Sequence, residues 1–268
     1  MNTSAIKNVL RNLLGEKLTA RIHGYWFLRL IKTKPLPDRE VNYLRNLNLR
    51  DTLALDVGAN GANWTKALSD LVGPAGKVIG FEAHPYYFQA TRAAVSYDEA
   101  MSMNSFIYPT AMSDQQSTLS LLIRENGVYL DGESRIIDFE GSQPLNSVIA
   151  EVEALELDVF LNNNGLEETK ISVIKLDVEG HESHVIRGAL KCIGRWLPVI
   201  VCELNKGEVG ELCHVEIRKV LENFGYELFI TDGSSLKKFT ALSQLDNHFS
   251  RNIICIHHNE TSVKGRVC

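Results

Sequence analysis

The strongest constraint in this sequence is an alternation of strand-like and helix-like segments that begins at residue 52. The strand-like segments are short apolar runs at 52–57, 77–82, 105–111, 171–177, 199–204, 226–231 and 252–257. Helix-like runs between them include 63–72, 86–97, 181–192 and 214–224. Strands that alternate with helices are typical of a layered α/β fold with a mostly parallel sheet. We therefore expect an α/β domain.

The segment 118–141, TLSLLIRENGVYLDGESRIIDFEG, departs from this alternation. It partly alternates apolar and polar residues, which is typical of a strand with one buried face. It also holds two glycine-centred turn dipeptides, Asn126-Gly127 and Asp131-Gly132. Such dipeptides favour tight β-hairpin turns. The segment is predicted to be a small β-hairpin insertion in the α/β domain.

Two strand-like runs end in acidic residues that together predict a nucleoside site. Asp56 ends the first run and is followed by Gly58 and Gly61, which let the backbone approach a ligand at the carboxyl edge of the sheet. Glu82 ends the second run, where a carboxylate can accept both hydroxyls of a ribose. The spacing also fits a nicotinamide dinucleotide. The phosphate-binding pattern GxGxxG is absent, however, which favours a nucleoside without a pyrophosphate.

Two further strand-like runs also end in carboxylates. Asp177 ends the run in ISVIKLDVEGHE and is followed by Glu179 and His181, and Glu203 ends the run in PVIVCEL. Ligands of open α/β sheets bind at the carboxyl ends of the strands. We therefore expect these acids near the same ligand as Asp56 and Glu82.

Five motifs, in this order, resemble the FkbM family of S-adenosylmethionine-dependent methyltransferases over about residues 50–257: LDVGAN, VIGFEAHP, AMSD, IKLDVEGHE…VIRGAL and PVIVCE. The resemblance implies a class I methyltransferase (Rossmann-like) fold, a seven-stranded sheet with helices on both faces. One strand of that sheet is antiparallel, and we expect it at 252–257. The resemblance also implies S-adenosylmethionine as the cofactor and methyl transfer to oxygen, typically a hydroxyl of a sugar or a polyketide-like metabolite.

The same resemblance implies roles for the residues that match the motifs. It assigns the methionine part of the cofactor to the loop with Asp56, Gly58, Asn60 and Gly61, the ribose to Glu82, and the adenine to Ser113 and Asp114. The sequence departs from the family at four places, two of which are Ala83, where a proline is commoner, and Gln115-Gln116, where a glycine often follows AMSD. It also has Ala62 where a glycine is usual, with the glycine displaced to Gly61, and it has His181 where a small residue is usual.

Catalysis of such a transfer requires an oxygen aligned with the S–CH₃ bond and water excluded. A sugar hydroxyl is a poor nucleophile, so a general base accelerates the reaction, typically by about 10²–10⁴-fold. Our candidates are Asp177, Glu179 and His181, with Glu203 as a further one. Glu179 and His181 could instead be polar residues at a helix N-terminus. A metal held by Asp177 and Glu203 is conceivable, but we expect none.

The first fifty residues differ from the rest of the chain in charge. They hold ten Lys and Arg against three Asp and Glu, while the whole chain has a net charge of −5. An amphipathic start and the aromatic run GYWFLRLIK precede Pro35 and Pro37. We therefore divide the chain into a basic helical N-terminal extension, 1–50, and a methyltransferase domain, 51–268. The extension could pack on the domain, lie on an anionic membrane, or reach an anionic substrate.

Composition narrows the cellular setting and the partners. The five cysteines are scattered and form no CxxC pair, and no apolar run is long enough to span a bilayer, so we expect a cytoplasmic protein. The acidic body argues against a nucleic-acid partner. We expect a glycan or small-molecule acceptor with a hydroxyl. An NAD(P)-dependent oxidoreductase and a non-catalytic nucleoside-binding protein stay open as alternatives.

Overall fold

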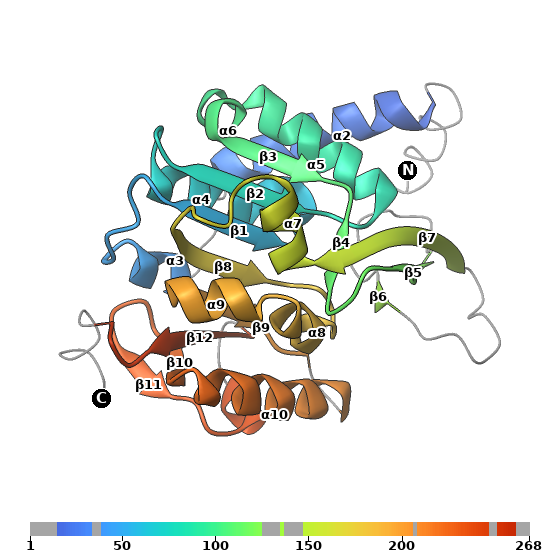
Figure 1. Ribbon diagram of the computed structural model, residues 1–268. Coiled ribbons are helices and arrows are strands. Elements are labelled where there is room, and N and C mark those ends of the chain that lie inside the picture. The colour runs from blue at the N-terminus through green and yellow to red at the C-terminus, as the bar shows by residue number, and fades with distance from the viewer. Residues whose placement is uncertain are drawn as a thin grey trace.

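The computed structural model describes residues 15–33, 39–124, 135–136, 147–205, 208–246 and 251–260. Within them, a large sheet carries helices on both faces, and a small sheet lies beyond the ends of its strands (Figure 1). The large sheet has eight strands: β1 (Leu53–Val57), β2 (Lys77–Phe81), β3 (Ser105–Tyr108), β8 (Ile171–Leu176), β9 (Val199–Glu203), β10 (Tyr226–Thr231), β11 (Leu236–Lys238) and β12 (Asn252–His257).

The strand order of the large sheet is β11-β10-β12-β9-β8-β1-β2-β3. Neighbours from β9 to β3 are parallel, and β12 is antiparallel to both β9 and β10. The predicted α/β fold and the antiparallel strand at 252–257 are thus confirmed. The expected count of seven strands was wrong, because the short β11 folds back on β10 and adds an eighth strand at the sheet edge.

The central strands are buried on both faces, as is usual for parallel sheets covered by helices. All five residues of β1 and all six of β8 are buried. Leu53, Leu55 and Val57 of β1 belong to the core that also contains α7 (Leu157–Asn163), α8 (Glu182–Arg187), α9 (Leu190–Trp196) and α10 (Glu208–Asn223). Ala54 faces the opposite core, formed with α3 (Arg39–Leu44) and α4 (Asn63–Val72). The alternation along β1 therefore builds both layers.

Two predicted segments are divided in the structure. The expected helix at 181–192 is split into α8 and α9 at Gly188 and Ala189, and Gly188 lies so close to β4 that a Cβ on it would be 1.9 Å from the carbonyl oxygen of Ser113. The expected strand at 105–111 ends at Tyr108 in β3, and Ala111 begins β4 (Ala111–Ser113) in the small sheet. The intervening Pro109 has no N–H to continue a ladder.

The small sheet consists of β4, β5 (Ser117–Arg124), β6 (Arg135–Ile136) and β7 (Ser147–Glu156), in the order β4-β7-β5-β6. A hairpin-like insertion was predicted at 118–141, but the long antiparallel partner of β5 is β7, and β6 pairs only with Leu121 and Leu122. The insertion therefore extends further along the chain than predicted. Both predicted turns, Asn126-Gly127 and Asp131-Gly132, lie outside the described residues.

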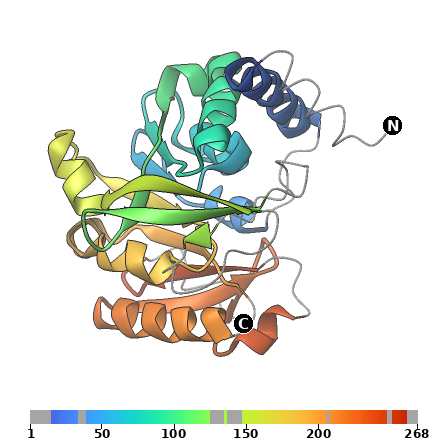
Figure 2. The same cartoon turned by 90° about the vertical axis from the view of Figure 1, so that its right-hand side faces the viewer.

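Helix α2 (Glu16–Thr33) lies against α5 (Pro85–Tyr97), which is followed by α6 (Glu99–Asn104). In Figure 2 the dark blue α2 runs beside the blue-green helix α5. A Cβ on Gly24 would lie 2.6 Å from the carbonyl oxygen of Ala90, so this glycine permits the close contact. The predicted amphipathic start of the chain and the break at Pro35 and Pro37 lie outside the described residues, and the boundary at residue 50 stays a prediction. None of the described helices is both long and apolar enough to cross a membrane.

Candidate functional site

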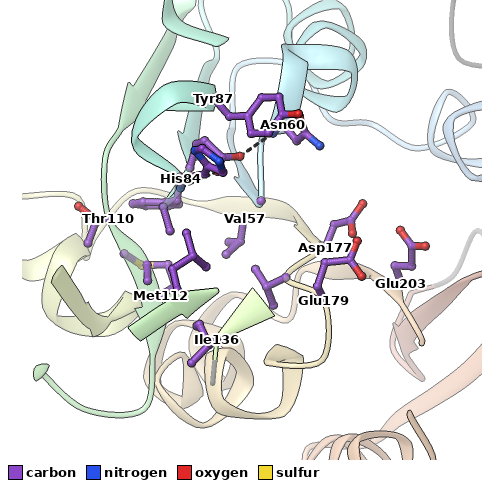
Figure 3. A pocket seen from close by; sticks show the side chains of 17 residues that line it. Val57, Asn60, His84, Tyr87, Thr110, Met112, Ile136, Asp177, Glu179 and Glu203 are labelled. Carbon is purple, nitrogen blue, oxygen red and sulfur yellow. Dashed lines mark hydrogen bonds between the residues drawn. The ribbon is translucent and has the colours of Figure 1, made fainter. Parts of the chain in front are cut away.

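A cavity of about 310 Å³ opens at the carboxyl ends of β1, β2, β8 and β9 (Figure 3). Its size is within the range of small-molecule sites. Four carboxylates line it: Glu82, Asp177, Glu179 and Glu203. Backbone from the loop after β1 and an apolar wall complete the lining: Val57, Gly58, Asn60, Phe81, Ala83, His84, Tyr87, Thr110, Ala111, Met112, Leu121, Ile136 and Val178.

The loop after β1 approaches the loop after β8 very closely at Gly58. Gly58 has φ 89°, and a Cβ there would lie 1.8 Å from the carbonyl oxygen of Asp177. The next turn, the 3₁₀ helix η1 (Asn60–Ala62), has left-handed backbone at both Gly61 (φ 73°) and Ala62 (φ 66°). The displaced glycine of the sequence therefore leaves an alanine in a conformation that glycine adopts more readily.

Asp56 lies beneath the cavity and does not line it. Its side chain is fully buried, and Thr65 donates a hydrogen bond of 2.6 Å to Oδ2. Oδ1 has no hydrogen-bond partner among the described residues. Burial raises the pKa of Asp56 to about 6, although the Thr65 hydrogen bond acts in the opposite direction.

Glu82 is held in the cavity wall by two backbone N–H groups. Asn60 donates to Oε2 at 3.0 Å and His84 donates to Oε1 at 2.8 Å. Burial nevertheless raises the pKa of Glu82 to about 7. The carboxylate is thus fixed in orientation, and its charge is poorly solvated before a ligand binds.

A buried lysine lies next to the acids that follow β8 and β9. Lys175 Nζ is 3.4 Å from Asp177 Oδ2 and donates to Asn252 Oδ1 at 3.0 Å. Burial disfavours its charge, but the neighbouring carboxylates, chiefly Asp177 and Glu203, hold the pKa of Lys175 above its usual value. This ion pair keeps Asp177 oriented at the cavity.

Glu203 lies beside Asp177 and pairs with Arg251 at 2.7 Å. Burial raises the pKa of Glu203, and the negative charge of Asp177 raises it further. Figure 3 shows Asp177, Glu179 and Glu203 together on one side of the cavity. Among the residues that the structure describes, no group of three or more His, Cys, Asp or Glu side chains is arranged to hold a metal ion.

Two glutamates that follow β8, Glu179 and Glu182, have different roles. Glu179 has a left-handed backbone (φ 53°) and lines the cavity, and burial raises its pKa. Glu182 is buried and accepts N–H groups of Val178 (3.1 Å) and Gly180 (3.1 and 3.2 Å). Glu182 is therefore the carboxylate that accepts the backbone N–H groups just before α8, and it was not among the predicted site residues.

Three predicted site residues lie together outside the cavity. Ser113 Oγ and His181 Nε2 are 2.9 Å apart in a hydrogen bond, and the His181 ring stacks on His184 with 4.1 Å between centroids. Asp114 Oδ2 accepts from Arg187 Nε at 3.0 Å. Five of the predicted site residues line the cavity: Gly58, Asn60, Glu82, Asp177 and Glu179. The other five do not: Asp56, Gly61, Ser113, Asp114 and His181.

Sequence reasoning missed two polar residues at this site. The signal for Lys175 was a single lysine within the apolar run ISVIKL, where a buried charge needs partners. His84 caps α5, because its Nδ1 accepts the N–H of Tyr86 at 3.1 Å, and it lies against Tyr87 with 4.7 Å between ring centroids. Burial lowers the pKa of His84 to about 4, so the imidazole is neutral at pH 7.

Comparison with known proteins finds a family model, the methyltransferase FkbM domain, that matches residues 56–228. No curated protein matches the chain. Similar solved structures include a methyltransferase FkbM from Methylobacillus flagellatus KT, 12% identical with TM-score 0.49, which covers 93% of this chain and 60% of that one. An O-methyltransferase from Bacillus cereus in complex with SAH is 11% identical with TM-score 0.46, and the match covers 94% of this chain and 97% of that one. This chain thus spans less than two thirds of the Methylobacillus protein.

Proposed function

The chain belongs to the FkbM methyltransferase family, and from that premise we propose that it transfers a methyl group from S-adenosylmethionine to a hydroxyl oxygen of a sugar, a glycan or a small metabolite. The observation that carries this proposal is the cavity, in which a fixed carboxylate at the tip of β2 faces three more carboxylates at the ends of β8 and β9. S-adenosylmethionine supplies an electrophilic methyl group. The protein must bind it, align the acceptor and receive a proton.

The cavity fits a nucleoside at Glu82. Each of its oxygens accepts one backbone N–H, and a carboxylate has about four acceptor positions, so capacity remains for two ribose hydroxyls. The apolar wall next to it, with Ala83, Met112 and Leu121, is suited to the flat face of an adenine. Ser113 and Asp114 have other partners, so this wall replaces them as our candidate for the adenine contact.

The acceptor proton goes to the pair Asp177 and Glu203 in this proposal. Lys175 holds Asp177 in place, and the proximity of two carboxylates raises the proton affinity of Glu203. A base is most effective when its pKa is near the working pH. Asp177 therefore orients the hydroxyl and Glu203 shares its proton.

Titration calorimetry tests the cofactor. We expect binding of S-adenosylmethionine and of its demethylated product, and no binding of NAD. Glu82→Ala should weaken cofactor binding by about 1.5–3 kcal/mol, because charge-assisted hydrogen bonds are lost. Glu211→Ala, which removes an exposed carboxylate on α10, is the matched control and should have no effect. Binding of NAD without S-adenosylmethionine would refute the proposal.

Mass spectrometry tests the reaction. Glycans and small hydroxylated metabolites from cells with and without the gene should differ by the mass of one methylene on a hydroxyl-bearing molecule. Purified protein and S-adenosylmethionine should then convert the unmethylated form. Cofactor binding without turnover on any acceptor that differs between the cells would instead indicate a non-catalytic nucleoside-binding protein.

A further inference from the structure

Helix α2 has two apolar faces, and within the part of the chain that the structure describes only one of them is buried. Its inner face, with Ala20, Gly24, Leu28 and Ile31, is buried against the domain. Its outer face exposes large apolar side chains: Leu18 (44% exposed), Tyr25 (53%), Trp26 (52%) and Leu30 (53%). At 3.6 residues per turn these four side chains lie within an arc of about 140°. They form a continuous stripe along the helix, which we call the outer stripe.

The outer stripe is accompanied by positive charge. Lys17, Arg21, Arg29 and Lys32 are exposed on the same helix, whose only acidic residue is Glu16. The Arg29 guanidinium lies 5.9 Å from the centre of the Trp26 ring. Arg21 donates to the Tyr97 hydroxyl and Lys32 pairs with Asp98, both at 3.4 Å. At 3.6 residues per turn Arg29 lies within the outer stripe and Arg21 and Lys32 lie at its flank, so the helix carries net positive charge beside the stripe although the whole chain has a net charge of −5.

We propose that the outer stripe of α2 binds an anionic membrane surface, with the helix axis parallel to the membrane plane. Apolar and aromatic side chains then enter the boundary between headgroups and acyl chains, and the basic side chains meet lipid phosphates. We favour a membrane as the partner because its negative charge complements the basic side chains of α2. A second copy of the chain would bring like charges together, and a nucleic acid would leave the stripe in water.

The inner face connects this surface to the cofactor cavity. Phe27 packs on the loop after β1, 3.5 Å from the position of a Cβ on Gly61. It also stacks on Tyr87 with 6.4 Å between ring centroids, and Tyr87 lines the cavity. Contacts through Phe27 and Tyr87 therefore link the helix that carries the lipid surface to the cavity, which suits an acceptor held in a membrane. This last point alone rests on the proposed function.

Vesicle flotation of the full-length protein tests the lipid contact. Wild-type protein should float with phosphatidylcholine vesicles that contain phosphatidylglycerol, bind phosphatidylcholine alone much more weakly, and be released by salt. R29E should reduce the partition coefficient by tenfold or more, since each basic residue contributes on the order of 1 kcal/mol near such a surface and the substitution also adds a negative charge. W26S/L30S should also reduce it. These variants leave the inner face of α2 unchanged.

Matched control substitutions are available on α10, where the side chains of Leu212 (63% exposed) and Val215 (59% exposed) are also apolar and accessible. L212S/V215S and K219E should float like wild type. Thermal melting and S-adenosylmethionine calorimetry on each variant separate a loss of lipid binding from unfolding or from failure of the proposed function. Equal flotation of R29E and wild type would overturn the proposal. So would a lipid-independent dimer that W26S/L30S abolishes, or duplex DNA binding in place of vesicle binding.

Discussion

Three acids that line the cavity differ in their partners, and the partners decide what each can do. Glu82 is held by backbone N–H groups, Asp177 by the ammonium of Lys175, and Glu203 by Arg251. Burial raises the pKa of both Glu82 and Glu203, and at Glu203 the neighbouring charge of Asp177 raises it further in spite of Arg251. Residue type alone therefore does not assign binding and base roles at this edge of the sheet.

At Glu82 we predict a pH-dependent cofactor affinity. Its pKa of about 7 means that the carboxyl gains a proton as the pH falls, and a protonated carboxyl is a poorer acceptor for ribose hydroxyls. Affinity for S-adenosylmethionine should thus fall below about pH 7, by at most about tenfold per pH unit. Glu82→Gln should bind more weakly with little pH dependence. Calorimetry across this range tests the prediction, and a wild-type affinity that stays constant would contradict it.

For catalysis we predict that Asp177→Asn lowers turnover by about 10²–10⁴-fold while cofactor affinity stays nearly unchanged. The reason is that the substitution keeps the shape but removes the charge and basicity. Glu203→Gln should act similarly, and the double variant should be less than additive because the two acids are neighbours. His181→Ala is the comparison, since His181 is bonded to Ser113 outside the cavity lining. If His181→Ala abolished turnover and Asp177→Asn retained it, the histidine would be the base.

At the scale of elements, glycines determine where segments can touch. Gly58 brings the loop after β1 onto the loop after β8, Gly188 brings α8 onto β4, and Gly24 brings α2 onto α5. Each of these contacts joins segments that are distant in the sequence. The first one also positions two walls of the cavity, because the atom that Gly58 approaches is the carbonyl oxygen of Asp177, which lines the cavity.

Gly58→Ala should therefore destabilise the protein strongly. A methyl group 1.8 Å from the Asp177 carbonyl oxygen cannot be accommodated, and φ 89° is unfavourable for alanine. We expect a loss of about 3 kcal/mol or more in the free energy of unfolding. Gly165→Ala is the matched control, because Gly165 has φ 65° but no atom within 4 Å of an added Cβ, so it should cost only about 1 kcal/mol. Urea titrations with equal losses for both variants would argue against the contact.

For the whole molecule, buried acids predict how stability changes with pH. The pKa values of Asp56 (about 6) and Glu82 (about 7) are raised by burial above their unfolded values near 4. The folded state then binds more protons than the unfolded state within that interval. Stability of the cofactor-free protein should accordingly fall as the pH rises from about 4 to about 7. Thermal unfolding midpoints measured without cofactor test this.

Glu82→Gln is the control for this pH profile, since it removes one of the carboxyl groups whose pKa burial raises and should flatten the decline towards neutral pH. Lys175 contributes nothing within this interval, because its pKa is raised from an already high value and it stays charged. A cofactor-free midpoint that rises steadily from about pH 4 to 7 would show that the acids are solvated in solution.

The sequence alone predicted most strands of the large sheet, because these depend on local apolar runs, and its motifs carried the resemblance to the family, which in turn implied the antiparallel strand at 252–257. The runs of β1 and β8 predicted buried parallel strands, and Asp177 and Glu82 followed from their positions at the tips. Only the tertiary structure decided which side chains face the ligand cavity. Orientation and long-range pairing depend on contacts between distant segments, as in β5 with β7, Ser113 with His181, and Lys175 with Asn252.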